Sequence, residues 1–158
     1  MKLESQASSL ELSKRLRDLG VKQESLYQWR RVKPYWEQDS EPAKNWSLSP
    51  SGVRENLGRS EEEIAAFTVA ELGPLLPKGI VPKKLEVYEL RITWANGKCV
   101  ICYGSYFNVK TGLREEEAVW HWEHSDTEAD ARASMLCYLI EQKIVIVDEI
   151  NRRLSDGK

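Results

Sequence analysis

The feature that most limits what this chain can fold into is an Asn96-Gly97 pair between two runs of alternating residues. Before the pair, every second residue is large and apolar: Tyr88, Leu90, Ile92 and Trp94. A period of two is typical of a half-buried strand. Asn-Gly favours a two-residue type I′ turn, because both central residues need a positive φ. The sequence therefore predicts a β-hairpin here.

A second turn, over 110–112, extends this hairpin into a three-stranded antiparallel meander over about 85–123. In the third strand, near 116–123, alternation places Trp120 and Trp122 on one face and Val119, His121 and Glu123 on the other. Apolar residues then lie on both faces, and one helical layer covers only one of them. An exposed tryptophan surface of this kind favours an unknown protein partner or self-association.

Two segments in the first half of the chain have the pattern of helices. Residues 9–19 carry leucines at helical spacing, Ser8 and Glu11 have the spacing of a capping box, and Gly20 stands where the helix should end. A second helix is expected over 69–76, after the capping-box pair of Thr68 and Glu71 and before Pro77. We expect a turn over 78–84.

The C-terminal part is also predicted to be helical. An Ala- and Leu-rich helix over 127–142 is expected to cover the sheet, and 148–154 forms another helix. Residues 144–147 fit a helix or a strand. A strand over 26–32, which Pro34 ends or places at an edge, can join the sheet. Residues 37–60 are predicted to be a loop or linker, in which Trp46 and Leu48 form a short strand.

These elements predict one α+β domain over 1–158, with a loop or linker insertion at about 37–60. Its centre is a three- to four-stranded antiparallel sheet, the meander at about 85–123, with helices packed on one face. The length of 158 residues suits one domain. No apolar run approaches the roughly 18 residues of a membrane span, and the N-terminus has no apolar signal core, so we expect a cytoplasmic protein without membrane contact. Its three cysteines are then reduced thiols.

The segment 27–36 interleaves aromatic residues with cations, a mixture that suits base stacking beside phosphate contacts. The candidate nucleic-acid-binding residues are Tyr27, Trp29, Arg30, Arg31, Lys33 and Trp36. The same mixture suits an edge strand with core aromatics and charged gatekeepers. The formal net charge of −2 favours this second interpretation, because phosphate binding needs a basic surface.

A degenerate helix-turn-helix over 11–31 is a related alternative. Gly20 stands at a plausible turn, and Leu26 follows six residues later. However, Leu16 occupies the position where closely crossing helices need a small residue, and Tyr27 and Trp29 favour a strand.

Two pairs of soft ligands form a weak candidate zinc site: Cys99, Cys102, His121 and His124. Residues three apart on a strand point to opposite faces, which separates each pair. His121 and Glu123 could do acid–base chemistry, but a lone His–Glu pair is more often structural. Because no catalytic motif is present in the sequence, we expect no enzyme activity and no cofactor.

Three blocks of the sequence resemble short uncharacterised proteins encoded by bacteriophages and prophages. The blocks are Leu10–Trp29, Ala66–Pro77 and Thr127–Val145. The resemblance implies a phage or prophage accessory protein in the bacterial cytoplasm, of unknown function and without known catalytic residues. Because the blocks are the segments expected to be helical, they suggest packing rather than a site.

Overall fold

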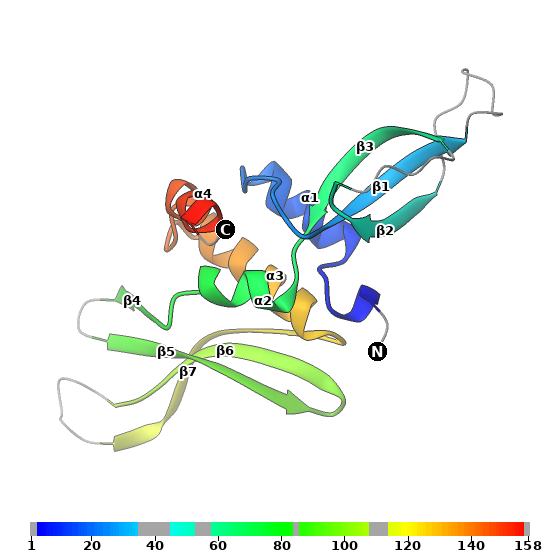
Figure 1. Ribbon diagram of the computed structural model, residues 1–158. Helices are drawn as coiled ribbons and strands as arrows, with labels where there is room; N and C mark the ends of the chain where they lie inside the picture. Colours follow the sequence, from blue (N-terminus) through cyan, green and yellow to red (C-terminus); the bar gives the residue numbers. More distant parts are fainter. Residues whose placement is uncertain (1–2, 35–44, 53–57, 84–85, 108–113, 157–158) are drawn as a thin grey trace.

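The computed structural model describes residues 3–34, 45–52, 58–83, 86–107 and 114–156. It contains two antiparallel sheets with helices between and beside them (Figure 1). The helices are η1 (Leu3–Ser5), α1 (Leu10–Asp18), α2 (Val69–Leu72), η2 (Gly73–Leu75), α3 (Glu128–Glu141) and α4 (Val147–Asp156). The strands are β1 (Tyr27–Pro34), β2 (Trp46–Pro50), β3 (Gly58–Ala66), β4 (Gly79–Lys83), β5 (Glu86–Ala95), β6 (Lys98–Phe107) and β7 (Arg114–Ser125).

The predicted meander is present as β5, β6 and β7. Asn96 and Gly97 have φ values of 52° and 76°, as a type I′ turn requires. The turn expected over 78–84 is wrong, because β4 pairs with β5 and makes the sheet four-stranded. Ile80 is buried opposite Tyr88, and an edge strand tolerates the nearby Pro82. The α+β class with a three- to four-stranded sheet is thus confirmed.

The strand predicted over 26–32 does not join this sheet. It is β1, the centre of a separate three-stranded sheet in the order β2-β1-β3. The loop expected over 37–60 is partly wrong, since β3 begins at Gly58, while the short strand at Trp46 and Leu48 is confirmed as β2. The parts of that loop at 37–44 and 53–57 lie outside the described residues.

Helix α1 follows the prediction, but its start differs. Its N-cap is Ser9, and the Ser8 hydroxyl instead accepts a hydrogen bond from the Phe67 backbone N–H at 3.0 Å. The expected pairing of Ser8 with Glu11 is therefore wrong. At the other end, Gly20 has a φ of +89° and ends the helix in a Schellman motif, with the N–H of Val21 bonded to the carbonyl oxygen of Leu16. A strand follows α1, so the helix-turn-helix over 11–31 is not formed.

The helices pack on one face of the four-stranded sheet (Figure 1). Helix α3 contacts β6 and β7, and it also contacts α1 and α2. The core between these layers is almost fully buried: Phe67, Leu72, Ile101, Tyr103, Met135, Leu136 and Leu139. The buried Tyr103 hydroxyl donates to the carbonyl oxygen of Pro77 at 2.7 Å, and burial raises its pKa.

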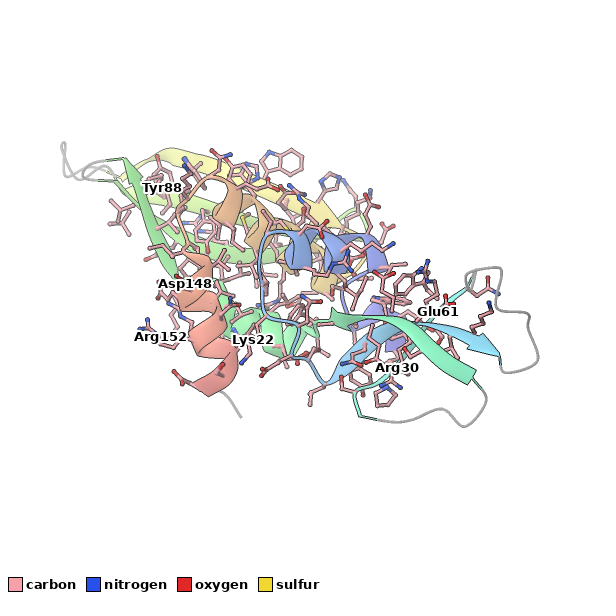
Figure 2. The ribbon with its side chains drawn as sticks, turned by 90° about the horizontal axis from the view of Figure 1, so that it is seen from above. Lys22, Arg30, Glu61, Tyr88, Asp148 and Arg152 are labelled. Carbon is pink, nitrogen blue, oxygen red and sulfur yellow. The ribbon has the colours of Figure 1, made fainter. Side chains whose placement is uncertain are left out.

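The C-terminal helices hold the N-terminal part of the chain. The Ser9 N–H donates to Asp130 Oδ1 at 2.6 Å, and Arg15 makes a two-point ion pair with Glu141. On α4, Asn151 accepts from the Lys22 N–H and donates to the carbonyl oxygen of Gly20. Figure 2 shows Lys22 beside this helix.

Residues 144–146 connect α3 to α4 and form neither the helix nor the strand considered for 144–147. Among the helices described, none is long and apolar enough to cross a membrane.

Candidate functional site

Two of the aromatic residues proposed for base stacking, Tyr27 and Trp29, are half-buried on β1. The Trp29 indole N–H donates to the carbonyl oxygen of Ser8 at 2.9 Å. The Trp46 ring is in contact with two cations, Lys14 at 4.9 Å and Arg31 at 5.5 Å from its centroid. A half-buried indole held in this way does not offer a free face for a base.

The two arginines of β1 have carboxylate partners on the neighbouring strand β3. Arg30 lies 3.2 Å from Glu63, and its side chain is only 7% exposed. Arg31 lies 3.7 Å from Glu61 and 3.3 Å from Glu62.

Figure 2 shows Arg30 and Glu61 on this sheet, far from Tyr88 of the meander. Lys33 is buried as well, and Trp36 lies outside the described residues. A phosphate group would have to displace these carboxylates, so the segment is poorly suited to nucleic acid.

The four candidate zinc ligands lie on opposite faces of the meander. Cys99 is buried and His121 faces α3, whereas Cys102 and His124 lie on the face away from the helices. Within the described parts of the chain, no group of three or more His, Cys, Asp or Glu is placed to hold a metal ion. All three cysteines, the third being Cys137 on α3, are free thiols.

The His121–Glu123 pair is built into the contact between β7 and α3. His121 Nε2 lies 2.9 Å from Glu123 Oε1. The imidazole stacks on the Tyr138 ring with 3.4 Å between centroids, and Glu123 accepts from the Ser134 hydroxyl at 2.9 Å. These contacts tie both side chains to the helix, which suits a structural role.

The outer face of the four-stranded sheet is the surface of β5, β6 and β7 that points away from the helices (Figure 1). Its side chains are Val87, Glu89, Arg91, Thr93, Val100, Cys102, Val119, Trp122 and His124. They form cross-strand rows, one of which is Arg91, Cys102 and Trp122. Trp122 is 56% exposed, and Val87 and Val119 are about half exposed. These apolar residues lie on a sheet face on which none of the described helices packs.

The two tryptophans of β7 do not share a face as predicted. The pairing of β6 with β7 shifts between Tyr103 and Gly104, where Trp120 is the extra residue of a bulge. Trp120 therefore lies against Tyr138 of α3, at 5.5 Å between ring centroids. Trp122 points outward, beside the His124 ring at 5.1 Å.

The sequence analysis missed Val87 and Cys102 as members of the outer face. The signal was present, because strict alternation from buried residues on each strand assigns both to the outward side. No family model, no curated protein and no solved structure matches this chain, so its function has to be argued from these residues alone.

Proposed function

We propose that this chain is a non-enzymatic interaction protein that associates with a second copy of itself through the outer face. The observation that supports this most directly is Trp122, which stands 56% exposed on a sheet face that none of the described helices covers. Tryptophan buries roughly 150–250 Å² and is enriched among the residues that dominate interfaces.

The size of the outer face suits a small specific interface. Strands β5 and β6 have ten residues each, which at about 3.3 Å per residue gives a length of about 33 Å. The three strands of the face, about 4.8 Å apart, give a width of about 14 Å, so each copy offers about 480 Å². Two copies together would bury about 950 Å², within the size range of weak, transient interfaces. We therefore expect a reversible dimer.

The charge of the outer face favours a second copy over a strongly charged partner. Glu89 and Arg91 carry opposite charges on the same strand, and the whole chain has a formal net charge of −2. Two such faces can meet without large like-charge repulsion, and a two-fold axis brings the same residues together from both copies. Two sheets packed in this way form a sandwich with about 10 Å between them.

A phage or prophage origin and a cytoplasmic location remain part of this proposal. They rest on the three sequence blocks described above. In the fold these blocks supply α1, α2 and α3, and α3 contacts both of the others around the core. This arrangement supports a role of the blocks in packing, which agrees with a protein that binds rather than catalyses.

Sedimentation velocity over a range of concentrations tests the dimer. Trp122→Ala should weaken self-association about tenfold or more, because it removes the largest apolar side chain of the face. Trp94→Ala is the matched control, since Trp94 is 57% exposed but lies outside the outer face. A wild-type protein that stays monomeric to millimolar concentration, or equal effects of both variants, would overturn the proposal.

A further inference from the structure

A groove is lined by residues from η1, the start of β1, the starts of α2 and α3, and the end of β5. Figure 1 shows η1 near the end of the β5–β6 hairpin. The groove's volume of about 630 Å³ lies within the range of sites that bind small molecules or short peptide segments. The apolar wall of the groove is formed by Leu26, Val69 and Trp94. The acidic residues Asp126 and Glu128 also line the groove. None of these residues belongs to the outer face.

Hydrogen bonds and strand pairing fix the backbone that carries the apolar wall. Leu26 is 66% exposed, yet its N–H donates to Glu71 Oε1 at 2.9 Å and its carbonyl oxygen accepts from the Ser51 N–H at 2.8 Å. Trp94 is 57% exposed at the end of β5, where it pairs with the buried Cys99. Because the backbone is held at both positions, only the two side chains have to be ordered when a ligand binds.

The charge of the groove selects a cation. Asp126 and Glu128 both line it, and no Lys, Arg or His is found among its described lining residues. Glu128 is already ion-paired with Arg132, which donates to its Oε1 at 2.8 and 2.5 Å, so Asp126 supplies most of the negative charge of the groove. The exposed Trp94 ring adds a second feature that attracts a cation.

From these features we infer that the groove binds a short segment of a partner protein in which an aliphatic side chain is followed by lysine or arginine. The aliphatic side chain packs between Leu26, Val69 and Trp94. The cation lies beside Asp126 and Glu128, over the face of the Trp94 indole. This inference does not depend on the dimer, because it uses different residues.

The test uses the full chain and three capped peptides, with binding followed by the backbone amide shifts in ¹⁵N–¹H NMR spectra. The first is acetyl-Ser-Leu-Leu-Lys-Lys-Ser-amide. The second replaces both lysines by glutamate, and the third replaces both leucines by serine. The first peptide should shift the amides around the groove and bind about tenfold more tightly than either of the others.

Variants assign this binding to the groove. Trp94→Ala should abolish the shifts, and Asp126→Asn should reduce the preference for lysine over glutamate severalfold. Trp122→Ala should leave peptide binding unchanged, so a failed dimer proposal and a failed groove proposal give different results. The inference is overturned if the first peptide produces no shift by about 5 mM, a concentration that detects even millimolar binding. Equal binding of the glutamate peptide overturns it too, as do shifts confined to the outer face. Equal binding of the leucine-free peptide would show a site for cations alone and would also overturn it.

Discussion

Replacing Glu71 by alanine should destabilise the fold far more than the loss of an ordinary surface carboxylate. Glu71 Oε2 accepts from the Thr68 N–H and the Thr68 hydroxyl, both at 2.8 Å, and from the Ser25 hydroxyl at 3.0 Å. Glu71 Oε1 accepts from the Leu26 N–H at 2.9 Å. One carboxylate thus completes the capping box of α2 and fixes the chain just before β1.

The magnitude follows from the two backbone donors that lose their partner. A hydrogen bond to a charged group contributes about 1.5–3 kcal/mol, and loss of a capping interaction costs about 0.5–2 kcal/mol. Water can replace part of this at the exposed Leu26 and the half-buried Thr68. We expect Glu71→Ala to lower the free energy of unfolding by about 2–3 kcal/mol, and Glu71→Gln, which keeps one acceptor oxygen, by about 1 kcal/mol.

Urea unfolding followed by tryptophan fluorescence measures both changes, with an unchanged m-value as evidence that the same surface unfolds. Glu149→Ala is the matched control, because Glu149 makes only a partly exposed i,i+4 pair with Arg153. That pair should contribute about 0.3–0.5 kcal/mol. Each extrapolated free energy of unfolding is uncertain by about 0.5 kcal/mol. If the loss of stability in Glu71→Ala exceeds that of the control by less than this amount, the bridging role of the carboxylate is refuted.

Three further predictions concern thiols, turns and nucleic acid. Burial raises the pKa of Cys99, and it raises the pKa of Cys137 to about 12. At pH 8 a thiol reagent should therefore modify Cys102 first, and the other two cysteines only when the protein unfolds. Equal modification rates of all three thiols would contradict this. In the unfolded chain Cys137 ionises near pH 9.0, so its contribution to stability is complete below that pH. Between pH 9.0 and about 12 this contribution falls by about 1.4 kcal/mol per pH unit. Urea unfolding at alkaline pH, with Cys137→Ala as the reference, measures the loss. Gly20→Ala and Gly97→Ala, at φ values of +89° and +76°, should each lower stability by about 1–2 kcal/mol in the same urea assay, and a neutral effect would argue against the turns described. Labelled oligonucleotides should show no steeply salt-dependent binding in fluorescence anisotropy, because Arg30 and Arg31 of β1 already have carboxylate partners. Micromolar binding at low salt would contradict this prediction.

Much of the fold could be predicted because its signals are local. The alternating run before Asn96, the glycine after α1 and the capping box at Thr68 each depend on residues close together in the chain. The three-stranded sheet could not be predicted in the same way. The acidic run of Glu61, Glu62 and Glu63 has the composition of a solvated loop, and it becomes a strand because Arg30 and Arg31 of β1 neutralise it.

The candidate sites show the same division. Exposed tryptophan on the meander could be predicted, but alternation assigned Trp120 and Trp122 to one face. The bulge in β7 places these two residues on opposite faces of the sheet, and no local sequence pattern predicts a bulge. The groove was missed altogether, because Leu26 and Trp94 lie far apart in the sequence and only the folded chain brings them to one groove.

The contacts that tie α1 to α3 and α4 have a consequence for synthesis on the ribosome. Helix α1 is made about 110–130 residues before its partners Asp130, Glu141 and Asn151. At about 5–20 residues per second, the apolar side of α1 waits roughly 6–27 s for its place in the core. The β5–β6 hairpin needs only its own neighbours and can form as it emerges. The hairpin should therefore form before α1 is packed, and the apolar side of α1 stays exposed until α3 and α4 have been made.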